Sequence, residues 1–253
     1  MSEPHVITSK PKKGVALITL NRAHEKNPLS ISMRAAISEH VISSEKDESI
    51  QCIVITGGDD CFSAGADIAE FSRYTSDRLK AEKLEQYWDP IRQCNTPIIA
   101  AVNGHCLGGG FELALLADII IAGSSAVFAQ PEVNLGVIPG SGATQLLPRL
   151  AGKYKAMRYL LTGQHFTAAD AESCGLVSEV VADDQVLTSA LSIAARIAAL
   201  PSTAIESIKR VVKDGAELPL EQAFQLERES QLQLIGSDDQ RRLMDGFLKR
   251  RRQ

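Results

Sequence analysis

Two glutamates stand out in this chain, because each lies in a short segment that is dense in glycine. Glu112 belongs to AVNGHCLGGGFELAL, and Glu132 belongs to FAQPEVNLGVIPGSG. An apolar, strand-like run over 97–102 leads into the glycines at 108–110, where a helical pattern begins. Such a junction leaves backbone N–H groups free at the start of a helix. Free donors beside two carboxylates suit one task, which is to hold a carbonyl oxygen as it becomes negative while protons move nearby.

Each of these features also has a purely structural interpretation. The three glycines could simply allow close packing of a helix on a sheet. Glu112 could stabilise the first turn of a helix through the helix dipole, and Glu132 could be a loop carboxylate in solvent. Against these interpretations, both glutamates have apolar neighbours, where a carboxylate is costly unless it serves a purpose. These neighbours are Phe111, Leu113 and Val133.

The segments around the two glutamates resemble the enoyl-CoA hydratase/isomerase family, whose members are also called crotonases. The family patterns PxIAAVNGxxxGGGxELAL and QPExxLGxIPGxGxTQ both occur here. Further matching segments occur in the same order along almost the whole chain: LNRAHEKNPLS at 20–30, ITGGDDCFSAGADI at 55–68, LTGQHFTAADAESCGLVSEVV at 161–181, and SDDQRRLMDGFLKRRRQ at the end.

The resemblance implies a fold, an activity and an assembly. The expected fold is α/β, a crotonase-like spiral of ββα units with a C-terminal helical trimerisation region. We place the spiral core at residues 1–195 and the helical region at 196–253. The expected enzyme adds water reversibly to a 2-enoyl-CoA and gives a 3-hydroxyacyl-CoA. The coenzyme A thioester is its substrate, no separate cofactor is expected, and the chain is expected to form a homotrimer or hexamer.

The resemblance also assigns roles to individual residues. The N–H groups of Gly109 and Ala66 would form the oxyanion hole, whereas the sequence around Ala66 alone indicates only an ordinary strand-to-helix turn. The family's hydratase branch carries two glutamates at the positions of Glu112 and Glu132, while its isomerases commonly keep one. We expect Glu112 to activate water and Glu132 to exchange the proton at C2. Coupled carboxylates share protons, so this division stays open.

The candidate coenzyme A contacts lie on several loops. The loop that holds Ala64, Asp67 and Ile68 lines the adenine and pantetheine path in the family. His24 and Glu25 stand in the first loop, where the family often has basic or apolar residues. Gly140 is expected to line the site near Glu132.

The basic run Lys249–Arg252 ends the chain. Cations at a helix C-terminus complement the helix dipole, and this is the interpretation that the sequence favours. The alternative is that Lys249 and Arg250 contact a coenzyme A phosphate, on this subunit or on a neighbouring one.

Composition limits the other possibilities. The chain has 253 residues, 44% hydrophobic and 23% charged, with a net charge of −4 and a pI near 5.8. These values are ordinary for a globular enzyme and argue against nucleic-acid binding. The five cysteines form no CxxC pair, so neither a disulfide framework nor a metal site is expected. The N-terminus has no signal pattern and no apolar run is long enough to span a membrane, so we expect a cytoplasmic protein.

The periodicity predicts alternating strands and helices, followed by helices almost alone. We expect a hairpin over 6–20, helices over 30–46 and 77–94, and strands over 51–56 and 97–102. A helix over 109–117 and a strand over 118–122 follow. From about residue 141 the apolar stripes are helical, interrupted by one short strand over 176–180.

Other enzyme classes fit poorly. The glycine runs break the GxGxxG dinucleotide pattern, and GK[ST] is absent. The five histidines lack metal spacing, and Ser141 lacks the context of a hydrolase nucleophile. The remaining rivals use the same scaffold: double-bond isomerisation, a specialised hydration in aromatic-acid catabolism, or non-catalytic binding of acyl-CoA or RNA. Both intact glutamates argue against a non-catalytic protein, and the overall acidity argues against RNA.

Overall fold

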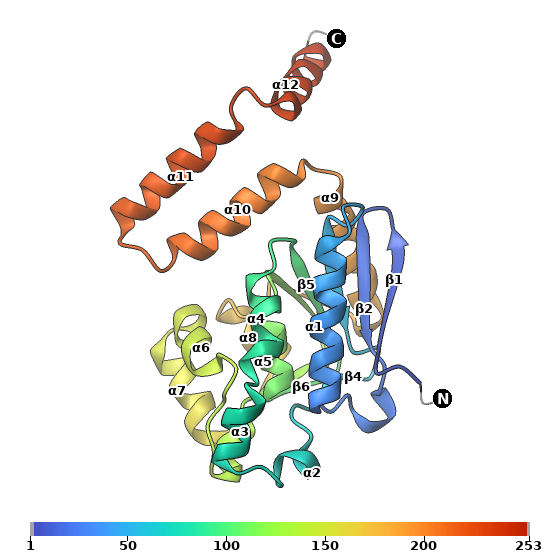
Figure 1. The fold of residues 1–253 in the computed structure, drawn as a ribbon, viewed down its shortest axis with the longest axis vertical. Coiled ribbons are helices and arrows are strands. Elements are labelled where there is room, and N and C mark those ends of the chain that lie inside the picture. Colours follow the sequence, from blue (N-terminus) through green and yellow to red (C-terminus); the bar gives the residue numbers. More distant parts are fainter. Residues whose placement is uncertain (1–2, 252–253) are drawn as a thin grey trace.

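The computed structural model describes residues 3–251 (Figure 1). It contains two sheets, and the chain passes repeatedly from one sheet to the other. The larger sheet has the strand order β1-β2-β3-β5-β7-β10, and the smaller has the order β4-β6-β8-β9. Each of three successive ββ pairs gives one strand to each sheet: β3 (Cys52–Thr56) with β4 (Cys61–Ser63), β5 (Ile98–Val102) with β6 (His105–Leu107), and β7 (Ile119–Gly123) with β8 (Val127–Ala129). This repeat is the expected ββα spiral.

The remaining strands close the two sheets at their edges. An antiparallel hairpin, β1 (Val6–Lys12) and β2 (Val15–Leu20), adds to β3, while β10 (Glu179–Val181) pairs in parallel with β7. The short β9 (Phe166–Thr167) pairs antiparallel with β8. The expected hairpin and the strands over 51–56 and 97–102 are therefore confirmed.

Helices cover both faces of the larger sheet, since its central strands are apolar on both sides. Helix α9 (Val186–Ala198) packs Val186, Ala190 and Ala194 against one face. The other face meets α1 (Ile31–Lys46), α4 (Glu85–Gln93) and α5 (Gly109–Leu115), whose apolar residues join the main core. The remaining helices of the body are α2 (Ile68–Phe71), α3 (Ser76–Glu82), α6 (Ala143–Ala151), α7 (Lys153–Thr162) and α8 (Ala168–Ser173), with short 3₁₀ turns η1 (Ala23–Glu25), η2 (Pro131–Leu135) and η3 (Asp183–Gln185).

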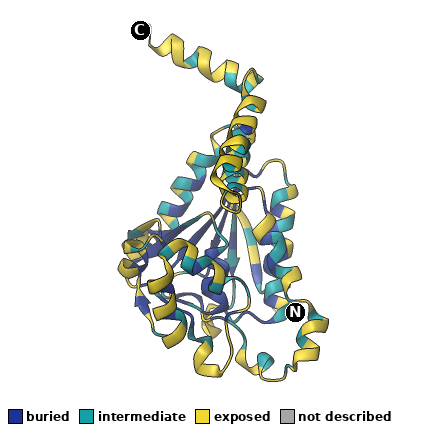
Figure 2. Cartoon of the chain, turned by 90° about the vertical axis from the view of Figure 1, so that its left-hand side faces the viewer, coloured by how far each residue is buried: buried dark blue, intermediate teal, exposed yellow. Residues whose placement is uncertain are grey.

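The last three helices extend away from the sheets (Figures 1 and 2). They are α10 (Ser202–Gly215), α11 (Leu220–Leu234) and α12 (Asp238–Arg250). Ser230 is their only buried residue in the part of the chain that the structure describes. The boundary that we predict after residue 195 lies within α9, and the division into a core and a helical region stays a prediction.

Two expected elements differ from the structure. The single helix over 77–94 is wrong, because the chain breaks at Lys83, whose φ of 46° is left-handed and ends α3. The strand over 176–180 begins later than expected. The amides of Leu176 and Val177 both bond back to the Ala171 carbonyl after the left-handed Gly175, so pairing with β7 starts only at Glu179.

No single helix within residues 3–251 has both the length and the apolar composition to span a membrane. The bent pair formed by Asp183–Ala198 and Ser202–Gly215, at 111°, meets those criteria only together.

Candidate active site

The glycine run at 108–110 holds the first candidate donor. Gly108 follows β6 with φ 49° and ψ −124°, and Gly109 is the first residue of α5. Every residue of α5 is buried. A Cβ atom on Gly110 would lie 2.6 Å from the Ser63 carbonyl oxygen, and one on Gly108 would lie 2.8 Å from Glu132 Oε1. Glycine is therefore required here both for close packing of α5 and for the approach of Glu132. The packing interpretation and the functional interpretation of the glycine run are compatible.

Gly109 and Ala66 lie side by side. Leu29 pairs with Ala66 in an isolated bridge, and its amide donates to the Gly65 carbonyl at 2.8 Å. A Cβ atom on Gly109 would lie 3.5 Å from Leu29 Cδ1 and 3.8 Å from the Ala66 nitrogen. Among the described residues, neither the Gly109 N–H nor the Ala66 N–H has an acceptor. Two free amides that lie side by side could both donate to one oxygen atom.

Glu112 is buried one turn into α5, with 3% of its surface exposed. Its Oε1 accepts hydrogen bonds from the amides of Ser141, at 2.6 Å, and Ala143, at 3.2 Å. These bonds join α5 to the glycine turn that starts α6. Two backbone donors therefore hold the Glu112 carboxyl group in place, which gives its buried oxygen hydrogen-bond partners.

Glu132 lies in η2, across from Gly108, and is only partly exposed. Burial, and after it the negative charge of Glu112, raises the pKa of Glu132 to about 7. The Gln130 side chain is fully buried, and with its amide nitrogen toward Glu132 it donates to both carboxylate oxygens, at 3.0 and 3.1 Å. Glu132 is thus held in place and can gain or lose a proton near neutral pH.

The expected binding residues occupy different surroundings. The Ala64 amide donates to the Lys26 carbonyl at 2.9 Å, and Asp67 caps α2 by accepting from the Glu70 amide at 3.0 Å. Ile68 is 52% exposed. This loop therefore runs from the Ala66 amide to the surface, as a path for a long thioester would require.

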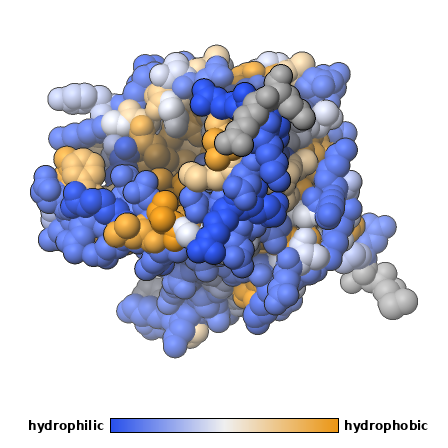
Figure 3. All heavy atoms as spheres, turned by 90° about the horizontal axis from the view of Figure 1, so that it is seen from above, coloured by the Kyte–Doolittle hydropathy of each residue, from blue (hydrophilic) through white to orange (hydrophobic). Residues whose placement is uncertain are grey.

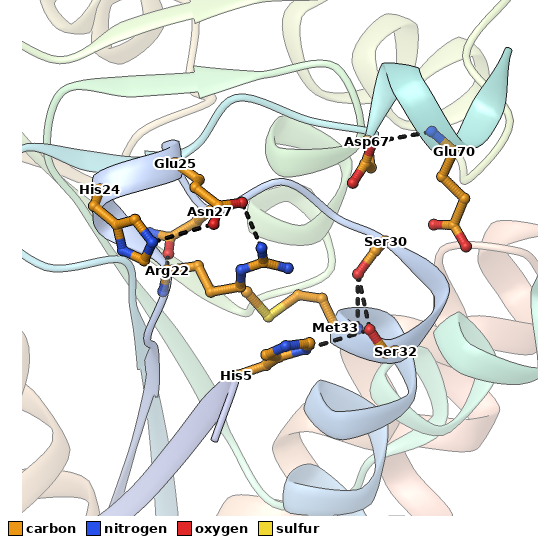
Figure 4. A network of polar contacts seen from close by, with 10 residues as sticks. All are labelled: His5, Arg22, His24, Glu25, Asn27, Ser30, Ser32, Met33, Asp67 and Glu70. Carbon is orange, nitrogen blue, oxygen red and sulfur yellow. Dashed lines mark hydrogen bonds and ion pairs between the residues drawn. The ribbon is translucent and has the colours of Figure 1, made fainter. Parts of the chain in front are cut away.

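The first loop carries a charged cluster at the surface. Glu25 pairs with Arg22 and His24, and Figure 4 shows this cluster together with Asp67, which caps α2, and Glu70, which lies within it. The hydrogen bond from Arg22 lowers the pKa of Glu25, while burial raises it to a smaller extent. Gly140 is exposed and lines, with Ser141, a cavity of about 900 Å³ between α4, α6 and α10.

Lys249 and Arg250 lie at the exposed end of α12, far from these residues in the same chain (Figure 1). One copy of the chain does not bring them to the site, so their contact with a coenzyme A phosphate stays a prediction that requires a neighbouring subunit. Arg252, in the same basic run, lies outside the described residues.

Sequence reasoning missed three residues that shape the site. Gln130 precedes Pro131-Glu132, outside every element that the sequence predicts. Asn27 is fully buried, and its side-chain nitrogen donates to the carbonyls of Gly57, Cys61 and Phe62. Arg34 lies within the predicted helix over 30–46, and nothing in the sequence sets it apart. Of the three residues, only Asn27 has a signal in the sequence, because the pair Asn27-Pro28 favours a turn.

Comparison with known proteins shows the family to which the chain belongs. The model of the enoyl-CoA hydratase/isomerase family matches residues 10–253. The chain belongs to this family. Its expected assignment as an enzyme, and its crotonase fold, are confirmed by relatives of nearly equal length and by solved structures of the same fold.

The curated relatives carry hydratase names. A probable mitochondrial enoyl-CoA hydratase of Dictyostelium discoideum is 42% identical over 244 residues, covering 96% of this chain and 88% of that protein. The 2,3-dehydroadipyl-CoA hydratase of Escherichia coli K12 is 36% identical over 251 residues, covering 99% and 97%. A crystal structure of an enoyl-CoA hydratase subunit from Geobacillus kaustophilus superposes with a TM-score of 0.94 at 39% identity, covering 97% of this chain and 95% of that one.

Proposed function

We propose that the chain is an enoyl-CoA hydratase that works through two glutamates and a backbone oxyanion hole. The observation that supports this most is the meeting of four groups from separate segments. The free amides of Gly109 and Ala66 lie together, Glu132 faces the adjacent Gly108, and Glu112 lies one turn along α5. The hydratase names of full-length relatives agree with this function.

The proposed reaction divides the work among these groups. Water adds to C3 of the enoyl group, and negative charge flows onto the thioester oxygen. The two amides bind that oxygen, and each is worth about 3–4 kcal/mol at the transition state. Glu112 takes a proton from the attacking water, while Glu132 delivers its own proton to C2. The two carboxyl groups then exchange a proton through solvent, which restores the starting state.

The rival activities on this scaffold differ in what they need. An isomerase moves one proton between two carbons of the same substrate and can use a single carboxylate, whereas addition of water benefits from two. The test measures hydration across a chain-length series of 2-enoyl-CoA thioesters, with isomerisation of 3-enoyl-CoA followed in parallel. Hydration that exceeds isomerisation on at least one substrate supports the proposal. Isomerisation alone, or binding without turnover, would refute it.

The raised pKa of Glu132 predicts a pH dependence. Below about pH 7 the carboxyl group holds the proton that C2 needs, and above about pH 7 it has lost that proton. We therefore expect kcat/KM for hydration to fall as pH rises through about 7, by about tenfold per pH unit. Stopped-flow or steady-state rates from pH 5.5 to 9 measure this. A rate that instead rises through pH 7 would show that Glu132 acts as the base.

The fixed geometry of Glu132 predicts a role for Gln130. Gln130→Leu removes both hydrogen bonds to the carboxylate and leaves a side chain of similar size. We expect kcat to fall by about tenfold or more, because a misplaced catalytic group loses rate steeply. The conservative variant Gln130→Asn keeps the amide on a shorter side chain. Its kcat should lie between those of Gln130→Leu and the wild type. Wild-type kcat in Gln130→Leu would contradict this positioning role.

The exposed helices at the C-terminus support the expected oligomer. Large apolar side chains on α10–α12 face outward in the single chain, and apolar groups appear between charged ones when this end is seen from above (Figure 3). Such a surface is typical of an interface between subunits. The exposed residues include Ile208, Val212, Leu220, Phe224, Leu232, Leu243 and Phe247.

We therefore expect a trimer or a hexamer in solution. Truncation before Glu217 removes α11 and α12 and should give aggregated or monomeric, inactive protein. Sedimentation equilibrium of the full chain and the truncated chain, each with an activity assay, makes the comparison. A stable and fully active monomer of the full chain at micromolar concentration would refute the oligomer and the cross-subunit role of Lys249 and Arg250.

A further inference from the structure

The Ala66 amide, proposed as one of the two donors to the thioester oxygen, follows a glycine. Gly65 has φ 95°, and a Cβ atom on it would lie 2.7 Å from the Leu107 carbonyl oxygen and 3.4 Å from the Gly109 nitrogen. This close approach requires glycine. A glycine also has more conformational freedom than any other residue. Its own preferences therefore cannot fix the direction of the Ala66 N–H, and other bonds must do so.

A hydrogen bond from a neighbouring segment fixes one side of this glycine. The Leu29 amide donates to the Gly65 carbonyl at 2.8 Å. That carbonyl and the Ala66 N–H belong to the same planar trans peptide group, so they point in opposite directions. The bond from Leu29 therefore sets the direction of the Ala66 N–H.

The hydroxyl of Ser63 fixes the other side of the glycine. It accepts a hydrogen bond from the Gly65 amide at 3.1 Å and donates one to the Asn27 carbonyl at 2.8 Å. Ser63 is fully buried, so bulk water does not compete for these bonds. Both peptide groups of Gly65 are thus joined to the segment 26–29, one through Ser63 and the other directly through Leu29.

The segment that receives these bonds is held firmly. Lys26 and Asn27 both have left-handed backbones, with φ of 64° and 49°, which is uncommon for residues other than glycine. The Asn27 side chain accepts from the Arg22 amide at 2.8 Å and donates to three nearby carbonyls. Such a backbone persists only where its surroundings hold it in place. Residues 26–29 can therefore act as a fixed support for Gly65.

We infer that Ser63 is a positioning residue of the oxyanion hole, whose hydroxyl holds Gly65 so that the Ala66 N–H points at the thioester oxygen. This inference rests on the proposed function, since it concerns the same site. Donors that are already aligned stabilise a developing negative charge well, because they need no reorientation when the charge appears. Without the hydroxyl the Gly65 amide loses this acceptor, and the glycine allows the next peptide group to turn away.

Ser63 has one other possible role, which is purely structural. A buried hydroxyl with two hydrogen bonds stabilises the fold, and its removal leaves two polar groups without these partners. A serine with this role alone would change the melting temperature but not the kcat of the folded enzyme. A serine that positions a donor to the transition state lowers kcat and kcat/KM together and leaves KM nearly unchanged.

The kinetic test uses two variants of Ser63. Ser63→Ala removes only the hydroxyl, and we expect kcat for hydration to fall about tenfold or more, with KM changed less than about threefold. Ser63→Cys keeps a weaker donor and acceptor, so its kcat should lie between those of Ser63→Ala and the wild type. The pH at which the rate falls should not move, because Glu132 is unchanged.

Ser44→Ala is the matched control. Ser44 is buried near the C-terminal end of α1, and its hydroxyl donates to the His40 carbonyl at 2.7 Å. The variant therefore also removes a buried, hydrogen-bonded hydroxyl, but at a place outside the proposed site. It should keep the wild-type kcat. Melting temperatures from circular dichroism, measured for every variant, show what each change costs the fold.

The carbonyl stretching band of a bound thioester reports the alignment of the amides without turnover. The probe is butanoyl-CoA with ¹³C at the thioester carbonyl, which has no double bond to hydrate. Hydrogen bonds to the oxygen lower the frequency of this band, so binding to the wild type and to Ser44→Ala should shift it downward. Ser63→Ala should lose about half of that shift, since one of the two donors no longer points at the oxygen.

The two measurements separate this inference from the proposed function. A folded Ser63→Ala protein with the full wild-type band shift would overturn the inference, and so would an unchanged kcat in that variant. If Ser63→Ala does not fold, the same comparison is made with Ser63→Cys, in which a full shift would again overturn it. A wild type that shifts the band but hydrates no 2-enoyl-CoA, with the shift reduced in Ser63→Ala, would contradict only the proposed function. No band shift in the wild type would refute the oxyanion hole and this inference together.

Discussion

Replacing either Glu112 or Glu132, the two glutamates that we propose to be catalytic, by glutamine is expected to leave a folded protein that hydrates 2-enoyl-CoA about 10²-fold or more slowly than the wild type. This range is the contribution of a positioned acid or base. The amide of Glu132→Gln cannot deliver a proton to C2. In Glu112→Gln the side-chain oxygen can still accept from the Ser141 and Ala143 amides, so the turn is kept while the base is lost.

These two variants require a control at a glutamate that lies outside the proposed site. Glu39, exposed on α1, provides it as Glu39→Gln, which should match the wild type in rate and in melting temperature. Initial rates on short and medium 2-enoyl-CoA thioesters, with circular dichroism for each variant, complete the set. Near-wild-type activity of Glu112→Gln or Glu132→Gln on every substrate would refute the two-glutamate mechanism.

The second large effect is expected at Gly109. Gly109→Pro removes the N–H that we propose to bind the thioester oxygen. Loss of one such donor costs about 10²–10³ in kcat, and the ring also occupies the space beside the Ala66 amide, so turnover should be abolished. The change is measured as kcat with saturating substrate.

The fold should tolerate this proline. Position 109 is the first of α5, where proline is common, and Gly108 is not in the helical conformation that a following proline disfavours. Gly109→Ala is the matched control, because its Cβ would meet only ordinary contacts, at 3.5 and 3.8 Å, and its N–H remains. It should keep clearly more activity than the proline variant. A folded Gly109→Pro enzyme within tenfold of the wild type would remove Gly109 from the oxyanion hole.

The sequence anticipated much of the fold because its signals are local. Apolar β-branched runs marked β3, β5 and β7, and the glycine run marked the start of α5. The smaller sheet escaped notice, since its strands have only two or three residues each and pair with partners more than 20 residues away. The break between α3 and α4 also left no signal, because Lys83 is an ordinary helix former in a left-handed conformation.

Part of the candidate site could also be predicted from the sequence. Glu112 and Glu132 attracted attention by their glycine-rich surroundings, and the resemblance supplied the partner amide of Ala66. The hydrogen bonds of Glu112 to the turn at 141–143, and the raised pKa of Glu132, depend on burial and on contacts between distant segments. The packing of Arg34 over Trp88 and its bond to the Leu29 carbonyl could not be predicted, because an arginine on a helix faces solvent far more often than the protein interior.

One isotope experiment tests the central claim most directly. The wild-type enzyme and Glu132→Gln are incubated with 2-butenoyl-CoA in water enriched in ¹⁸O, and the products are analysed by mass spectrometry with fragmentation. We predict that the wild type forms 3-hydroxybutanoyl-CoA with one ¹⁸O atom at C3 and that the variant forms it at least about 10² times more slowly. Recovery of unchanged or isomerised thioester from the wild type, with no ¹⁸O at C3, would contradict the assignment as a hydratase.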